Sequence, residues 1–227
     1  MASLPGCESI DELLRESHEK RKRADYLLRN RQVIVEVKTL EVDQFHRTQT
    51  FIDRLNAEGR VYAAGRHWAD TIYRGLPDEL KRKMLYTITK GLEDDAAHAD
   101  RQTRYTREIF SIPNALGVLV VLNDGAPTLS PALISYGLGR LLEKKRPDGS
   151  LRYTQNDGVI MFSATHVVPE EHGGQGMPCF MTANPSSRLP QVFYEFGTGL
   201  MADFARFLGI PTVKVTKEAI SDAERRE

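Results

Sequence analysis

Two carboxylates and a lysine lie in neighbouring apolar segments of this chain. Asp25 precedes Tyr26-Leu27-Leu28, and Glu36 and Lys38 interrupt an otherwise apolar run from Val33 to Leu40. Asp and Glu oxygens are the ligands that Mg²⁺ and Mn²⁺ prefer, usually with one or two carboxylates from the protein and with water and phosphate at the remaining positions. Whether these side chains can act together depends on the elements that position them.

The residues around these side chains predict two paired strands. Residues 24–28 and 32–40 are separated by Arg29-Asn30-Arg31, and the second segment is rich in β-branched residues. Side chains two residues apart share a face, so Glu36 and Lys38 point one way and the valines point the other way. The valine face is suited to a core. A covered charge without a partner is costly, so the other face needs solvent, a partner or a metal.

The short connection between the two strands sets their register. If Asn30 and Arg31 form a two-residue turn, antiparallel pairing places Asp25 directly opposite Glu36, with about 4.5 to 5.5 Å between the Cβ atoms. Like charges at such positions destabilise a sheet unless a cation lies between them, and Lys38 is only a diagonal neighbour. A divalent ion resolves this conflict. The competing interpretation is a simple surface ion pair between Glu36 and Lys38.

Helical and strand patterns alternate along the rest of the chain. The predicted elements are a helix over 8–20, helical pieces over 45–57, 66–74 and 77–108, a strand over 115–122, a helix over 130–144, a strand over 158–168, a loop over 169–190 and a helix over 189–208. The last helix carries a core-facing stripe formed by Phe193, Phe196, Leu200, Phe204 and Phe207. We expect an α/β fold with a mixed sheet, in one domain over 1–227, with a helical insertion over 41–108.

Bulk composition indicates an ordinary globular protein. The 227 residues are 41% hydrophobic and 27% charged, and no stretch approaches the roughly 20 apolar residues that a membrane span needs. Residues 1–7 show no secretory signal, and Cys7 and Cys179 are too few for a disulfide framework, so a cytoplasmic protein without a membrane partner is expected. The formal net charge is zero, but residues 20–23 and 144–146 form local basic groups.

The residues of the predicted hairpin resemble a known signature. Ala24-Asp25-Tyr26 and Val35-Glu36-Val37-Lys38 look like the motif of the PD-(D/E)XK nuclease superfamily, the restriction-endonuclease-like fold of many restriction enzymes and Holliday-junction resolvases. The predicted helix before the motif and the strand, helix and strand after it are similar to the αβββαβ core of that fold. The resemblance covers roughly half of the chain, without the 41–108 insertion or the C-terminal helix. Ala24 stands where the signature has Pro, and the insertion separates two strands that are normally close in sequence.

This resemblance implies a metal-dependent endonuclease or exonuclease that hydrolyses phosphodiester bonds of DNA. Asp25 and Glu36 would bind Mg²⁺ or Mn²⁺, and the carbonyl of Val37 could add a ligand. Lys38 would position or deprotonate the attacking water and offset charge on the phosphate. Cutting two strands needs two sites, so a homodimer is among the expectations. The alternative function is a non-catalytic nucleic-acid-binding or protein-interaction module that retains the nuclease fold.

Further polar residues are weaker candidates for the same site. Many members of the superfamily place a Glu of the first helix near the metal, which makes Glu12 and Glu16 candidates by position, although both fall off the apolar stripe of that helix. Gln44 and Gln49 follow the signature, where some relatives supply a supporting Gln, but surface positions are the default interpretation. The sequence leaves open DNA against RNA, endonuclease against exonuclease, and substrate shape.

Overall fold

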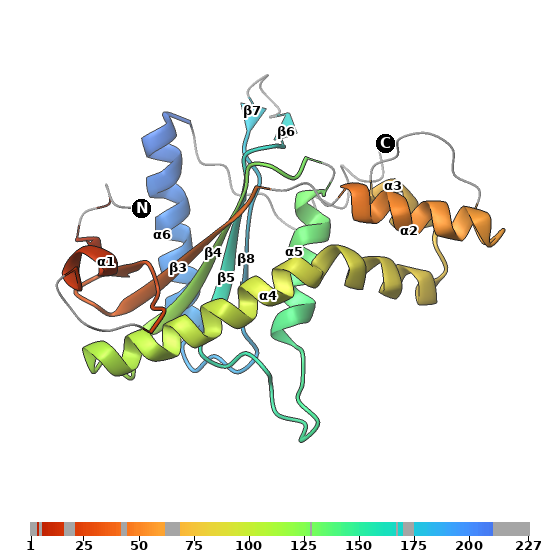
Figure 1. Ribbon diagram of the computed structural model, residues 1–227. Coiled ribbons are helices and arrows are strands. Elements are labelled where there is room, and N and C mark those ends of the chain that lie inside the picture. Colours follow the sequence, from red (N-terminus) through yellow and green to blue (C-terminus); the bar gives the residue numbers. More distant parts are fainter. Residues whose placement is uncertain are drawn as a thin grey trace.

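A six-stranded mixed sheet forms the centre of the protein in the computed structural model, which describes residues 4, 6–15, 21–41, 45–61, 69–127, 129–166, 168–169 and 175–210 (Figure 1). The strand order is β1-β2-β3-β4-β5-β8. The strands are β1 (Glu8–Ser9), β2 (Tyr26–Leu28), β3 (Val33–Leu40), β4 (Leu116–Asn123), β5 (Gly158–Ser163) and β8 (Cys179–Ala183). β3, β4 and β5 pair in parallel, and the other pairs are antiparallel. The α/β class and the mixed sheet are therefore confirmed.

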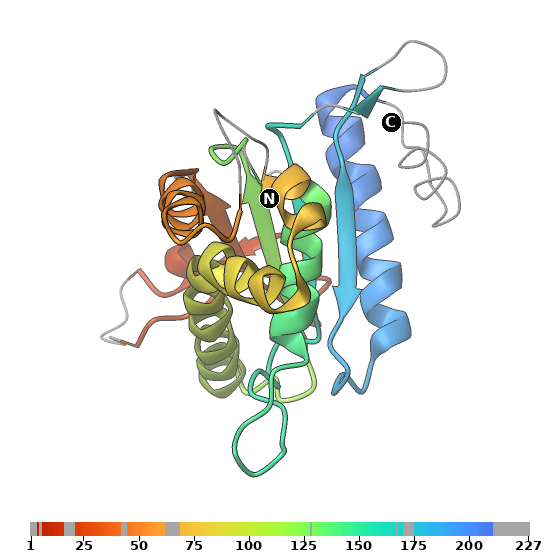
Figure 2. The same ribbon diagram turned by 90° about the vertical axis from the view of Figure 1, so that its right-hand side faces the viewer.

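Helices cover both faces of this sheet. They are α1 (Ile10–Leu13), α2 (Phe45–Ala57), α3 (Ala69–Gly75), α4 (Asp78–Phe110), α5 (Pro131–Leu142) and α6 (Pro190–Leu208). α6 packs on one face with Val118, Val120 and Ile160, whereas α2, α4 and α5 pack on the opposite face with Leu119, Val121 and Met161 (Figures 1 and 2). The central strand β4 is buried on both faces, as its continuous apolar run predicts.

Residues 41–108, which we expected to form a helical insertion, connect the parallel strands β3 and β4. Parallel neighbours need a long crossover connection, and α2, α3 and α4 supply it. α4 is 33 residues long, and its buried Leu92, Ala96 and Ala99 belong to the hydrophobic core on that face of the sheet. The connection thus contributes directly to the core and brings a long helix across β3.

Four sequence expectations about the elements need correction. The predicted helix over 8–20 is a two-residue strand followed by the short α1, and residues 16–20 lie outside the described residues. The strand predicted over 158–168 ends at Ser163, and Val168–Pro169 (β6) instead pairs with Gln175–Gly176 (β7). The predicted loop over 169–190 contains β8, which pairs with β5. Phe207 was expected in the core but is 71% exposed, beyond the sheet-facing stripe of α6.

Local sequence signals explain the helix that links β4 and β5. Ser130 occupies the N-cap of α5, where its side-chain oxygen accepts a hydrogen bond from the N–H of Leu133 at 3.1 Å. Pro131 follows at the first helical position, where a missing N–H has no cost. Within the described ranges, no helix combines the length and the apolar character that crossing a membrane requires.

Candidate functional site

The β2–β3 hairpin has the register that the sequence predicts. Tyr26 pairs with Val35, and the N–H of Gln32 donates to the carbonyl of Arg29 at 3.2 Å to close the turn. The two central turn residues have positive φ, 53° for Asn30 and 65° for Arg31. Positive φ at both positions matches the right-handed twist of the flanking strands. The two-residue turn is therefore confirmed, and it fixes which side chains oppose each other.

Asp25 lies just before β2, where the regular pairing of the two strands ends. Its backbone N–H donates to the carbonyl of Val35 at 3.2 Å, whereas a regular ladder would direct it to the carbonyl of Glu36. The regular ladder therefore ends at Tyr26 and Val35, and the direct pairing of Asp25 with Glu36 that the sequence predicts is not formed. The side-chain Oδ2 of Asp25 then accepts a hydrogen bond from the N–H of Val37 at 2.7 Å. In a strand, the N–H and C=O of one residue point to the same neighbour, so the carbonyl of Val37 faces the same side as Asp25. The Asp25 carboxylate is thus bound to the backbone of β3 at Val37, just before β2 begins.

Glu36 is a fully buried carboxylate on the face covered by α4. Its exposed fraction is 0%, and neither of its oxygens accepts a hydrogen bond of regular geometry from any described residue. Lys38 is its charge partner, with 2.5 Å between Nζ and Oε1, and the Lys38 side chain remains 25% exposed. Such a carboxylate is costly unless a cation compensates it. The pair lies at the rim of the core, and its lysine is in contact with solvent.

The acids of the hairpin have shifted protonation equilibria. Burial raises the pKa of Glu36 to about 7, the Asp25 charge adds to the rise, and Lys38 opposes it. Burial also raises the pKa of Asp25, while the Val37 N–H and the Lys38 charge lower it. Asp11 on α1 raises the Asp25 pKa further, which places this acid near Asp25. A side-chain hydrogen bond with Glu36, in contrast, lowers the pKa of Asp25. Two carboxylates this close can share a proton or a cation.

Helix α4 holds the segment that carries Asp25. The side-chain amide of Gln102 donates to the carbonyl of Arg23 at 2.7 Å, and the buried N–H of Ala24 donates to the hydroxyl of Thr106 at 2.9 Å. Gln102 also lowers the pKa of Glu36 by hydrogen bonding, so the same side chain contacts both Glu36 and the segment before Asp25. α4 therefore positions Asp25 and Glu36 relative to each other.

Helix α4 contributes a further acid, Asp95, on which the charge of Lys38 acts. Burial raises the pKa of Asp95, and the positive charges of Lys38 and His98 lower it. Sequence reasoning missed Asp95, Gln102 and Thr106, although their spacing of seven and four residues places them on one side of a helix. The spacing alone could not identify the strand on which that side of α4 docks.

The weaker candidates are placed away from the site or outside the described residues. Glu12 is exposed on α1, and Asp11 rather than Glu12 acts on Asp25. Gln49 donates to Asp53 at 2.8 Å in an exposed pair on α2, as a surface residue would. Glu16 and Gln44 lie outside the described residues. Neither Glu12 nor Gln49 is brought to the Asp25 and Glu36 carboxylates.

The donors at the hairpin fit a hard divalent cation. Glu36 offers buried oxygens without regular hydrogen bonds, and the nearby Asp25 is oriented by the N–H of Val37. Mg²⁺ is commonly held by one or two carboxylates, with waters and substrate phosphate at the other positions. In the described part of the chain, no group of three or more His, Cys, Asp or Glu side chains is placed to hold a metal. Two carboxylates and a carbonyl are what this hairpin can offer to such an ion.

Most basic groups that stand out in the sequence are engaged in ion pairs or ring contacts. Arg21 lies 3.0 Å from Glu108, Arg31 lies 2.7 Å from Glu8, and Lys144 lies 2.6 Å from Glu93. Arg29 lies over the ring of Phe196 at 5.2 Å. These cations therefore tie elements of the fold together, which favours the structural interpretation of the charge clusters.

Comparisons of the chain with protein-family models, with curated proteins and with solved structures found no match. The geometry of Asp25, Glu36 and Lys38 therefore carries the functional interpretation.

Proposed function

We propose that the protein is a metal-dependent nuclease that hydrolyses phosphodiester bonds of DNA. One observation carries the proposal: the β2–β3 pairing and the bond from the Val37 N–H hold Asp25 near Glu36, a fully buried carboxylate whose oxygens accept no regular hydrogen bond. Neighbouring carboxylates destabilise a sheet unless they serve a cation, so their presence next to a lysine favours catalysis over a scaffold role. The resemblance of the hairpin to the PD-(D/E)XK signature supports DNA as the substrate.

In this proposal Asp25, Glu36 and the carbonyl of Val37 hold Mg²⁺ or Mn²⁺. The ion would supply Lewis-acid polarisation of the phosphate and a more acidic bound water. Asp25 is held in place by the N–H of Val37, so its free oxygen is oriented before any ligand arrives. Preorganisation of this kind avoids reorganisation during the reaction.

Lys38 assists the attacking water and offsets negative charge on the phosphate. Its Nζ lies 2.5 Å from Glu36 Oε1, and its side chain is partly exposed, so the ammonium group is at the boundary between the buried carboxylate and solvent. An ammonium group is a compact charge with three donors that can reorient between a carboxylate, a water and a phosphate oxygen. The Lys38 charge also acts on Asp95 of α4, whose pKa it lowers.

The direct test is cleavage of single-stranded, double-stranded and branched DNA and of RNA, with Mg²⁺ or Mn²⁺. Wild-type protein should cleave at least one DNA substrate, and Glu36→Gln and Lys38→Ala should each lower the rate by about a hundredfold or more. Glu143→Gln is the matched control, because Glu143 is an exposed acid paired with Arg140 on α5. Cleavage that persists unchanged in Lys38→Ala, or that needs no divalent ion, would contradict the proposal.

The ion pair between Glu36 and Lys38 favours a second candidate, a non-catalytic nucleic-acid-binding or protein-interaction module. In that case the lysine alone compensates the buried carboxylate. Metal-dependent melting separates the two functions, because an ion that binds only the folded protein raises the melting temperature. A rise with Mn²⁺ in wild type that is lost in Glu36→Gln supports the nuclease, and an unchanged melting temperature favours the module.

A further inference from the structure

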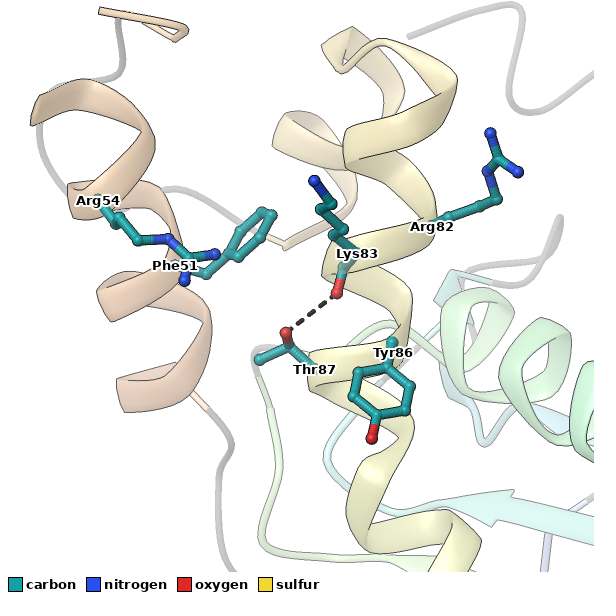
Figure 3. Close-up of a pocket in the computed structure, with 6 residues that line it drawn as sticks. All are labelled: Phe51, Arg54, Arg82, Lys83, Tyr86 and Thr87. Carbon is teal, nitrogen blue, oxygen red and sulfur yellow. Dashed lines mark hydrogen bonds between the residues drawn. The ribbon is translucent and has the colours of Figure 1, made fainter. Parts of the chain in front are cut away.

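A hollow of about 330 Å³ lies between helices α2 and α4 (Figure 3). Its lining consists of three cationic side chains, two aromatic rings and a hydroxyl: Arg54, Arg82, Lys83, Phe51, Tyr86 and Thr87. Both helices belong to the crossover between β3 and β4. We call this hollow the α2–α4 groove.

The cations of the α2–α4 groove are exposed and weakly engaged. The guanidinium of Arg54 lies over the ring of Phe51 at 5.4 Å, and its distance to Glu58 is 3.9 Å. Arg82 donates to a backbone carbonyl of its own helix at 3.4 Å. Lys83 pairs with Glu79 at 2.6 Å, but both side chains are more than half exposed. Exposed pairs of this kind are weak in water, so a phosphate can replace them at little cost.

Tyr86 adds an exposed aromatic surface to the same groove. Its side chain is 59% exposed, on the outer side of α4, where Figure 3 shows it beside Thr87. A large aromatic ring in contact with solvent next to cationic groups suits an unpaired base, which stacks on the ring while the phosphates contact the cations. Tyr73 of α3, in the same crossover, packs against the core instead.

Helix α4 links this groove to the candidate site. Lys83 and Asp95 are twelve residues apart on α4, which at 1.5 Å per residue is about 18 Å. Between them, Thr87 and Gly91 lie on one side of the helix at a spacing of four residues. A stacked strand advances about 3.4 Å per nucleotide, so this separation corresponds to about five nucleotides.

We propose that the α2–α4 groove binds the phosphate backbone of single-stranded DNA about five nucleotides from the bond that is cut, with one base stacked on Tyr86. This inference rests on the proposed nuclease function. It assigns strand positioning to Arg54, Arg82 and Lys83, which lie outside the candidate metal site.

Binding of a fluorescent single-stranded oligodeoxynucleotide of about 20 nucleotides, measured without divalent metal, tests the groove separately from catalysis. The test protein carries Arg54→Gln, Arg82→Gln and Lys83→Gln, and the control carries Arg140→Gln and Arg206→Gln, two exposed arginines paired within their own helices. The groove variant should bind at least about tenfold more weakly and lose about two units of the salt slope, which is about 0.7 per phosphate contact on single strands. The control should match wild type.

Tyr86→Leu tests the stacking contact. It should weaken binding of single strands about fivefold or more, leave the salt slope unchanged and have little effect on duplex DNA. Groove and Tyr86 variants that bind like wild type overturn the inference, as does an equal loss in the arginine control.

The outcomes also separate this inference from the proposed function. If the wild-type protein cleaves DNA and the groove variants have an unchanged KM on long substrates, the nuclease proposal is supported and the groove proposal is wrong. If the protein cleaves no substrate but its DNA binding depends on the groove residues, the nuclease proposal is wrong and the groove is still a nucleic-acid-binding site. A wild-type protein that neither binds nor cleaves DNA contradicts both.

Discussion

The carboxylate of Asp25 accepts a hydrogen bond from the backbone N–H of Val37 at 2.7 Å. This bond joins the acid at the start of β2 to the strand that carries Glu36 and Lys38. It continues the β2–β3 ladder with a side chain at the point where backbone pairing ends. The Asp25 carboxylate therefore has a structural role in the hairpin and a proposed role as a metal ligand. Substitutions of Asp25 can separate the two roles.

Asp25→Asn should keep the structural role and lose the proposed metal role. The Asn oxygen still accepts the Val37 N–H, so the free energy of unfolding should change by less than about 1 kcal/mol. Asp25→Ala leaves that N–H without its acceptor and should cost about 1 to 3 kcal/mol. Urea denaturation measures both values. The metal-dependent rise in melting temperature should be lost in both variants, and its retention in Asp25→Asn would remove Asp25 from the ligand set.

Glu36 should make the protein less stable as pH rises. Its folded-state pKa of about 7 exceeds the ordinary value of 4.5, so between these values the folded protein keeps a proton that the unfolded chain has released. The free energy of unfolding therefore falls through this window, by on the order of 1 to 3 kcal/mol, and changes no further at higher pH.

Denaturation without metal, at about pH 5 and about pH 8, measures this effect, and Glu36→Gln should lack that part of the pH dependence. Identical pH profiles for wild type and Glu36→Gln would show that Glu36 does not titrate in this range.

Lys38→Met should destabilise the protein by leaving the Glu36 carboxylate buried without its charge partner. The loss should be largest above about pH 8, where Glu36 is ionised, and should reach about 1 to 3 kcal/mol. Adding Glu36→Gln to Lys38→Met should restore part of the loss, which gives a coupling energy of at least about 1 kcal/mol. Additive effects of the two substitutions in denaturation experiments would argue against a stabilising ion pair.

Thr106→Val tests how α4 holds the segment before Asp25. Valine has the shape of threonine but cannot accept the buried N–H of Ala24, so a loss of about 1 to 3 kcal/mol is expected. Thr87→Val on the same helix is the matched control, because its hydroxyl bonds an exposed carbonyl of Lys83. That change should stay within about 0.5 kcal/mol. Equal effects in thermal or urea unfolding would show that the Ala24 bond does not matter.

Two glycines should respond in opposite directions to alanine. A Cβ at Gly158 on β5 would lie 2.4 Å from the ring of Phe193, so Gly158→Ala should cost about 1 to 3 kcal/mol through overpacking. A Cβ at Gly91 on α4 meets nothing within 4 Å, and Ala is the better helix former, so Gly91→Ala should stabilise by up to about 1 kcal/mol. Calorimetric melting of both variants checks the signs.

Element types that depend on nearby residues could be predicted, and elements that depend on distant partners could not. The paired strands, the buried run of β4 and the capped start of α5 carry strong local patterns. β8 was missed because Cys179-Phe180-Met181-Thr182-Ala183 is short, has little alternation and is bounded by proline. It becomes a strand because β5 offers an edge with which it can pair. Phe207 follows the helical period but extends beyond the sheet that α6 covers.

The sequence by itself determined the register of β2 against β3, because a two-residue turn and the period of two in a strand are local properties. Only the tertiary structure decided what surrounds Asp25 and Glu36. Gln102 and Thr106 lie about 80 residues from the segment they hold, as their hydrogen bonds to Arg23 and Ala24 show. The burial that shifts the pKa of Glu36 comes from α4, whose position depends on the packing of its whole apolar face against the sheet. Local patterns specify register, whereas the surroundings of a charge are a property of the assembled core.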